Sequence, residues 1–250
     1  MQLRIATDPA AAASLAADAI ARRLRFAVLR RGEASVAFSG GSTPAMMLAD
    51  LATMSVPWQY VRVFQVDERV APDGDPRRNR NLLDVLPIGA HQLHAMPVTV
   101  RDLAAGARRY AAKLPDRFDV VHLGLGDDGH TASWPPGDPV VHSERAVDLC
   151  GEYAGTVRMT LTPRAVNAAR SRLVLAVGAS KRPMVERWLA GDTSLPVQRV
   201  RRTDTVVILD TAAAPSTPAA PATPAAPATA AAPPTPAAPA TPAAPAPARH

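Results

Sequence analysis

The 250-residue sequence lacks several features that would place it in common classes of protein. It contains one cysteine, Cys150, so no internal disulfide can form and a reducing compartment is favoured. It has neither a CxxC nor an HExxH pattern, and its histidines are too scattered to predict a metal site. No GxSxG follows an expected strand, which argues against a serine nucleophile. We therefore expect any hydrolysis to use an activated water, with no metal and no cofactor.

Long apolar runs and the charged-then-apolar order of a signal peptide are also missing, so we expect a cytoplasmic protein without a membrane partner. The formal net charge is +6, but the basic residues are scattered. Their tightest cluster, Arg199, Arg201 and Arg202, has no interleaved aromatic residues, which argues against a nucleic-acid partner. Only two of the 28 basic residues are lysines, Lys113 and Lys181, so a lysine within a motif is notable.

The last forty residues, 211–250, differ in composition from the rest of the chain. They are almost entirely alanine, proline and threonine, and threonines recur every six residues, mostly within the unit TPAAPA. Such a segment has nothing large to bury, and its prolines remove amide donors. We expect it to be a disordered, low-complexity tail. Residues 1–210 are then long enough for one domain with a well-buried core.

Short β-branched runs alternate with helical patterns along residues 1–210. The expected strands are Ala34–Phe38, Val61–Val66, Asp119–Leu125, Val157–Leu161, Arg172–Val177 and Thr205–Leu209. The expected helices are Ala10–Arg31, Pro44–Met54, Asn79–Leu86, Arg101–Lys113, Pro163–Ala169 and Arg182–Ala190. This alternation predicts a single α/β domain with a mostly parallel sheet flanked by helices. In such sheets ligands bind beyond the carboxyl ends of the strands, so the residues after each strand are the candidates for function.

The first of these strand exits reads SGGSTP. Gly40 and Gly41 permit a sharp turn into a helix whose first amides would point outward, an arrangement that binds anions. Ser42 or Thr43 can also cap this helix, and Pro44 suits its first position. An ordinary capped turn therefore explains the same residues as well as a phosphate site does.

Three further positions after or within expected strands carry charge. VDER places Asp67, Glu68 and Arg69 at a strand exit, although a surface cluster whose members neutralise one another is the alternative. VRMTLTP supplies Arg158, which would lie in solvent if its strand were at a sheet edge. Lys181 follows a Gly-Ala-Ser turn at a helix start, where the helix dipole disfavours a cation unless an anion also binds there.

The remaining exit, GLGDDGHTASWPPG at residues 124–137, contains a histidine among glycines. Histidine is the side chain best matched to proton transfer near neutral pH, so His130 is a candidate general base. Asp127 or Asp128 can orient its ring through a hydrogen bond. Because Asp-Gly pairs also form ordinary turns, the motif alone leaves catalysis and structure evenly matched.

Taken in order, the blocks SGGSTP, VDER, GLGDDGHTAS, RMTLTP and GASK resemble the 6-phosphogluconolactonase family. The resemblance spans residues 3–210 and is far more specific than any single block. It implies a Rossmann-like α/β fold and the hydrolysis of 6-phospho-D-glucono-1,5-lactone to 6-phosphogluconate, a step of the pentose phosphate pathway. The partner is then a small sugar phosphate. Oligomeric state does not follow from the sequence.

Matched position by position, the resemblance implies a role for each block. His130 matches the family's proposed general base, which Asp128 helps to orient, and Asp67 matches an active-site carboxylate. Arg69 or backbone amides would stabilise the oxyanion. The cations that hold the phosphate and carboxyl end of the ligand match Arg69, Arg158 and Lys181, and the loop against the sugar phosphate matches Gly40, Gly41 and Ser42.

Two departures from the family pattern stand out. Trp134-Pro135-Pro136 follows HTAS where the family usually has Leu-Phe-Pro, and Arg80 replaces the usual serine before Asn81. Neither departure touches a proton-transfer residue, so we expect altered loop packing and intact chemistry.

Two other functions are compatible with parts of the pattern. Glucosamine-6-phosphate deaminases share GGSTP-like and DGH blocks, but the expected DGHIAF and DEY are DGHTAS and DER here, which favours the lactonase. A sugar-phosphate-sensing domain of a transcription regulator would need a DNA-binding module. Only about eight residues precede the first expected helix, so we expect no such module.

Overall fold

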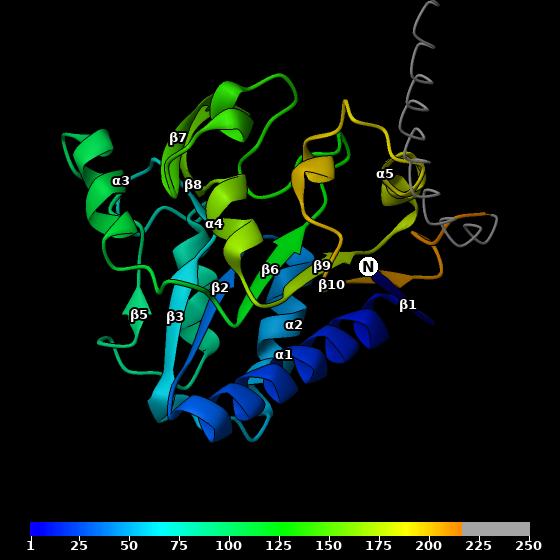
Figure 1. Ribbon diagram of the computed structural model, residues 1–250, viewed down its shortest axis with the longest axis horizontal. Helices are drawn as coiled ribbons and strands as arrows, with labels where there is room; N and C mark the ends of the chain where they lie inside the picture. The colour runs from blue at the N-terminus through cyan, green and yellow to red at the C-terminus, as the bar shows by residue number, and fades with distance from the viewer. Residues whose placement is uncertain (217–250) are drawn as a thin grey trace, which may run out of the picture. The chain divides into compact units, whose positions relative to one another are not determined.

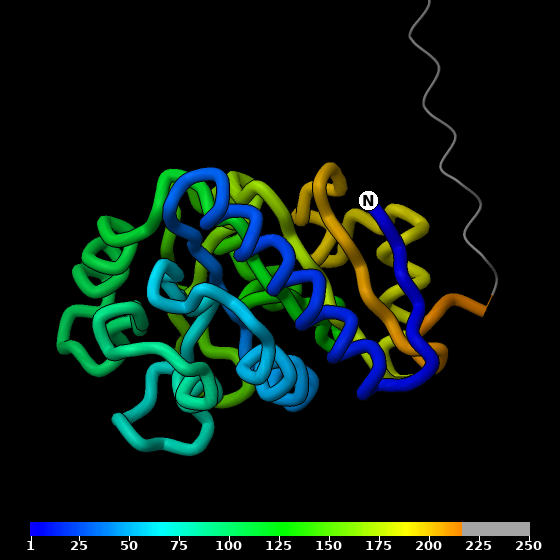
Figure 2. Tube along the Cα trace, turned by 90° about the horizontal axis from the view of Figure 1, so that it is seen from below, coloured from blue at the N-terminus to red at the C-terminus, as the bar shows by residue number. Residues whose placement is uncertain are grey.

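The computed structural model describes residues 1–216, and the predicted tail from residue 217 onward lies outside these residues (Figures 1 and 2). Its centre is a seven-stranded sheet with the order β1-β10-β9-β6-β2-β3-β5, in which every pairing is parallel. The strands are β1 (Gln2–Ala6), β2 (Ala34–Phe38), β3 (Val61–Gln65), β5 (Leu93–His94), β6 (Val120–Gly124), β9 (Arg172–Ala176) and β10 (Thr205–Asp210). The predicted α/β class is thereby confirmed, although β1 and β5 were not predicted.

Helices cover both faces of this sheet (Figure 1). Along β2 and β6 the buried side chains alternate: Val36 and Val120 pack toward α1 and α2, and Ala37 and Val121 pack toward the opposite face. The helices are α1 (Pro9–Arg31), α2 (Ser42–Thr53), α3 (Leu103–Ala111), α4 (Pro163–Ala168) and α5 (Arg182–Leu189). None of the helices within residues 1–216 is both long and apolar enough to cross a membrane.

Helix α1 shows how the local sequence sets an element. The Asp8 carboxylate accepts a 2.8 Å hydrogen bond from the Ala11 amide, and Pro9 occupies the first helical position. Ile20 and Leu24 are fully buried together with a row of alanines, and these small side chains let the helix lie close to the sheet. Figure 2 shows α1 running across the sheet face as one long blue helix.

A second, antiparallel sheet packs beside the first and was not predicted. Its order is β4-β8-β7, with β4 (Asp67–Arg69), β8 (Thr156–Leu161) and β7 (Val147–Tyr153). The expected strand Val157–Leu161 therefore forms but does not join the parallel sheet. The reason is a tight hairpin, whose two-residue turn places Ala154 and Gly155 at φ of 50° and 77° and pairs β8 with β7.

Two further expectations differ from the structure. Residues Asn79–Val85 form a 3₁₀ helix where an α-helix was expected. Residues 211–216 were assigned to the disordered tail, but Ala213 is fully buried and the Arg182 Nε donates to the Ala212 carbonyl at 3.0 Å. The predicted domain boundary at residue 210 is therefore too early, because small alanines pack as well as larger residues when a neighbour covers them.

Trp134, the first residue of the Trp-Pro-Pro departure, is a core residue. Its side chain is completely buried, and its indole Nε1 donates a 2.8 Å hydrogen bond to the Leu161 carbonyl at the end of β8. This contact ties the segment after His130 to the second sheet. Whether this packing differs from that of the usual Leu-Phe-Pro sequence stays a prediction.

Replacing Trp134 by Phe tests this hydrogen bond. Trp134→Phe removes the donor and leaves a buried carbonyl with one partner fewer, so we expect it to cost more stability than Trp188→Phe. Trp188 is the matched control because it is equally buried, and its Nε1 has no hydrogen-bond partner among residues 1–216. The expected difference in the free energy of unfolding, from urea titration, is about 1 kcal/mol. Equal losses would contradict the assigned role.

Candidate active site

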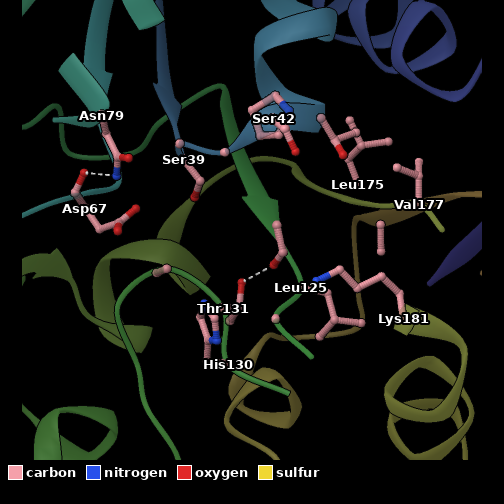
Figure 3. Close-up of a pocket in the computed structure, with 18 of the residues that line it drawn as sticks. Ser39, Ser42, Asp67, Asn79, Leu125, His130, Thr131, Leu175, Val177 and Lys181 are labelled. Atoms are coloured by element: carbon pink, nitrogen blue, oxygen red, sulfur yellow. Dashed lines mark hydrogen bonds between the residues drawn. The ribbon is translucent and has the colours of Figure 1, made fainter. Parts of the chain in front are cut away.

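A pocket of about 240 Å³ opens at the carboxyl ends of the neighbouring strands β2, β6 and β9, where the parallel sheet predicts a ligand site. Figure 3 shows Asp67 and Asn79 on one side of this pocket and Lys181 on the other. Asp128 is the one predicted site residue that does not line it. The predicted residues that do are Gly40, Gly41, Ser42, Asp67, Arg69, His130, Arg158 and Lys181.

His130 is held from behind by Asp128. The His130 Nδ1 lies 2.6 Å from Asp128 Oδ1, and the His130 amide also donates to that oxygen at 3.1 Å. Partial burial raises the pKa of Asp128, but hydrogen bonds from Tyr153 and His130 outweigh it and lower the pKa to about 2. The carboxylate is therefore charged at neutral pH and accepts a hydrogen bond from the Nδ1–H group of His130. This tautomer leaves the lone pair on Nε2 for proton transfer.

Gly126 is required by the position of this histidine. A Cβ atom at residue 126 would lie 1.9 Å from His130 Nδ1 and 2.7 Å from Asp128 Oδ1. No side chain can occupy that space without displacing the imidazole. The glycine-rich sequence of the loop thus makes room for the histidine and its carboxylate partner.

The choice between Asp127 and Asp128, open in the sequence, is resolved by the geometry. Asp127 forms an ion pair with Lys181, 2.9 Å from Oδ1 to Nζ, and the hydrogen bond from Lys181 lowers the Asp127 pKa. Lys181 precedes α5 directly, as predicted, so this carboxylate offsets a cation at a helix start. Because Asp127 is 67% exposed, the pair is weak and an incoming anion can compete for the ammonium.

Arg69 and Arg158 stand directly opposite each other on β4 and β8. Side chains at such positions have Cβ atoms about 4.5–5.5 Å apart, and like charges there are destabilising. Arg158 is only 7% exposed, because β8 is the central strand of its sheet. The alternative of an edge arginine in solvent is therefore wrong. Both arginines line the pocket, so this wall carries two positive charges.

Asp67 lies beside these two arginines. It is buried, and its Oδ2 accepts a 2.7 Å hydrogen bond from the Ser133 hydroxyl. Burial raises the pKa of Asp67, while Ser133 and the positive charges of Arg158 and Arg69 oppose the rise. The VDER residues Asp67 and Glu68 are thus interior groups, and the alternative of a solvated surface cluster is wrong.

Glu68 organises the wall that carries Arg69. It is completely buried, and its two carboxylate oxygens accept hydrogen bonds from Gln65 Nε2 and from the amides of Arg69, Asn79 and Arg80, all at 2.8–3.0 Å. Arg78 Nε lies 3.0 Å from Glu68 Oε2 in a buried ion pair, although it makes no hydrogen bond within residues 1–216. A single carboxylate therefore joins β3, β4 and the start of the 3₁₀ helix.

Asn79 connects the residues that Glu68 holds with the pocket. Its Nδ2 donates to the Asp67 carbonyl at 3.0 Å, and its Oδ1 accepts from Arg69 Nη1 at 2.7 Å (Figure 3 shows the first bond). A Cβ at Gly40 would lie 1.9 Å from that Oδ1, so only glycine fits there. Gly41 is the N-cap of α2 and Ser42 its first residue, and within residues 1–216 no side chain caps this helix, so the expected cap by Ser42 or Thr43 is wrong. Ser42, Thr43 and Pro44 of its first turn line the pocket, so the amino end of the helix borders it.

Sequence reasoning missed three residues of the site. Asn79 was assigned only as a helix start. Ser39 is buried, and its hydroxyl, directed into the pocket, has no hydrogen-bond partner among the described residues (Figure 3). Tyr153, whose hydroxyl bonds Asp128 at 2.7 Å, belongs to the unpredicted hairpin. A polar residue directly after a strand was the available signal for Ser39; Tyr153 had none.

Within residues 1–216 no three His, Cys, Asp or Glu side chains are grouped as a metal site would need. The pocket instead combines a histidine–aspartate pair with three cations.

Comparison with known proteins places the chain in a family. Residues 7–209 match the family described as "Glucosamine-6-phosphate isomerases/6-phosphogluconolactonase", and the chain belongs to that family. A 6-phosphogluconolactonase from Nostoc sp. is 31% identical over 230 residues, which cover 84% of this chain and 96% of the relative. Another, from Streptomyces coelicolor, is 34% identical over 245 residues, covering 85% and 93%.

Solved structures agree with these relatives. The 6-phosphogluconolactonase of Shewanella baltica is similar with a TM-score of 0.78 and 28% identity, over 84% of this chain and 97% of that one. A monomeric glucosamine-6-phosphate deaminase has a TM-score of 0.72 at 19% identity, covering 85% of this chain and 98% of its own. At that identity the deaminase shows the shared fold alone.

The buried Glu68 predicts a large stability effect. Glu68→Gln removes the buried counter-charge of Arg78 and leaves its guanidinium only the exposed Asp73, so we expect a loss of about 3 kcal/mol in the free energy of unfolding, measured by urea titration. The matched control is Asp84→Asn, which removes the exposed partner of Arg80 from the same segment. That change should cost less than about 1 kcal/mol. Similar losses for the two variants would contradict the role of Glu68.

Proposed function

We propose that the chain hydrolyses 6-phospho-D-glucono-1,5-lactone to 6-phosphogluconate, the oxidative-branch step of the pentose phosphate pathway. One observation carries this proposal: the paired arginines Arg69 and Arg158 face the same pocket as the His130–Asp128 pair. An anionic substrate and a proton-transfer group thus meet in one cavity. The named relatives, matched over nearly their whole length, support the same reaction.

His130 acts as the general base. With Nδ1 bonded to Asp128, its Nε2 accepts a proton from a water molecule as the water oxygen attacks the lactone carbonyl carbon. Asp128 stabilises the imidazolium that forms, because its charge lies 2.6 Å from Nδ1. When the tetrahedral intermediate collapses, the ring oxygen leaves and takes a proton from His130. The product is an open-chain carboxylic acid with a free hydroxyl group, and it releases one proton to solvent to become the carboxylate at neutral pH.

The pocket cations bind two negatively charged groups, the substrate phosphate and the oxyanion that develops during the reaction. The phosphate of the substrate is held by Arg158 and Lys181, together with the amides at the start of α2. Lys181 exchanges its exposed partner Asp127 for the phosphate. Arg69, whose guanidinium is fixed by Asn79, stabilises the oxyanion that develops on the carbonyl oxygen.

Asp67 supplies a negative charge beside the two arginines. Its buried carboxylate lies near both, and the Ser133 hydroxyl fixes one of its oxygens. We assign it an electrostatic role in orienting the cations, while proton transfer belongs to His130.

A reducing compartment suits the single Cys150, so the cytoplasm is the proposed location.

A direct assay tests the reaction. Freshly generated 6-phosphogluconolactone is supplied to the full chain, and hydrolysis is measured above the spontaneous rate. Acceleration over that background is expected. A parallel reaction with glucosamine 6-phosphate tests for ammonia release; ammonia without lactone hydrolysis would mean that the chain is a deaminase.

Removing the base should abolish turnover with little effect on binding. His130→Ala eliminates proton transfer at Nε2 but leaves the cations in place, so kcat should fall by roughly 10²–10⁴-fold while KM changes little. His91→Ala, at an exposed histidine that does not line the pocket, is the control and should retain full activity. Near-normal turnover by His130→Ala would refute the assignment.

A further inference from the structure

The β7–β8 hairpin brings a tyrosine to the back of the proposed base. β7 ends at Tyr153, the two-residue turn follows, and β8 returns with Arg158 facing the pocket. The strand pairing shifts register between Cys150 and Tyr153, so the tyrosine lies beyond an irregularity in the ladder. One hairpin therefore supplies both an anion-binding arginine and a tyrosine next to His130.

The tyrosine hydroxyl closes a triangle with the His130–Asp128 pair. It donates a 2.7 Å hydrogen bond to Asp128 Oδ2, and its oxygen lies 3.1 Å from His130 Nδ1. Asp128 Oδ1 is occupied by the same Nδ1 at 2.6 Å, so each carboxylate oxygen has its own partner. The two rings meet edge to face with centroids 5.2 Å apart. Neither the carboxylate nor the imidazole can rotate without losing one of these contacts.

The ring of the same tyrosine lies under Arg158. The guanidinium carbon is 5.0 Å from the ring centroid, within the range of a cation–π interaction. Arg158 is 7% exposed, and its Nε has no hydrogen-bond partner within residues 1–216. The aromatic face is thus a neighbour that stabilises a buried cation.

We propose that Tyr153 is a positioning residue that aligns the base through its hydroxyl and the anion-binding Arg158 through its ring. This inference rests on the proposed function, because it assigns His130 and Arg158 their roles there. Tyr153 does not line the pocket, and it acts through the two residues that do.

The charged and titratable groups around Tyr153 determine what its hydroxyl does. Asp127, Asp128 and His130 face it from the loop after β6, and Arg158 faces it from β8. Burial and the bond to Asp128 raise the pKa of Tyr153 to about 12, so the phenol stays protonated and remains a donor. The hydrogen bond that the phenol donates reduces the negative charge on the Asp128 carboxylate oxygens. Without this hydrogen bond, the Asp128 carboxylate would stabilise the protonated form of His130 more strongly.

Two substitutions separate the hydroxyl from the ring. Tyr153→Phe keeps the ring under Arg158, so kcat should fall by roughly 3- to 10-fold with KM unchanged. The acid limb of the kcat/KM profile should move to higher pH, because the base then becomes deprotonated only at higher pH. Tyr153→Leu also removes the cation–π contact, and KM should rise in addition by about 2- to 5-fold. Tyr60→Phe, at a tyrosine 52% exposed and outside the pocket, should match the wild type.

The readouts distinguish failure of this inference from failure of the proposed function. A wild-type chain without lactonase activity would overturn the function itself. An active wild type together with a Tyr153→Phe variant of unchanged kcat and unchanged pH profile would overturn the inference alone. A fall in kcat accompanied only by a lower melting temperature, with the pH profile fixed, would reduce Tyr153 to a packing residue and also overturn it.

Discussion

The buried carboxylate of Glu68 is the interaction on which the pocket depends. It satisfies the Gln65 side chain and three backbone amides of the segment that follows β3, and it neutralises the buried Arg78. The backbone of Arg69 and Asn79 is thereby fixed at both ends of the loop between them. An interior charge is costly unless its partners are complete, and here they are complete. The result is a rigid wall of the pocket, and this wall holds Arg69, the proposed oxyanion-binding cation.

Both walls of the pocket depend on close approach between backbone and side chains. His130 fits because Gly126 has no side chain, and Asn79 fits because Gly40 has none. Charge then completes the site. Arg69 and Arg158 lie side by side across two strands, with Asp67 buried near them. Such a group of like charges needs a counter-charge, which Asp67 supplies in part and which the substrate phosphate completes in the proposed function. Binding and catalysis thus share one electrostatic arrangement.

Much of the fold and of the site could be predicted from the sequence, because short-range signals define them. Apolar runs predicted β2, β6 and β9, and the residues that follow these strands line the pocket together. The rest depends on tertiary contacts. Asp127 and Asp128 are neighbours in one turn, so only the fold assigns one to Lys181 and the other to His130. The burial of Arg158 and the contacts of Tyr153 follow from a hairpin whose turn, Ala154-Gly155, carries no strong sequence signal.

The central claim is that proton transfer and anion binding share one pocket. A crystal structure of the chain with bound 6-phosphogluconate tests it most directly. The account predicts the product's carboxylate within hydrogen-bond reach of His130 Nε2, about 2.6–3.2 Å, with its phosphate in contact with the pocket cations. A product bound elsewhere, or bound in this pocket with its carboxylate end away from His130, would contradict the account.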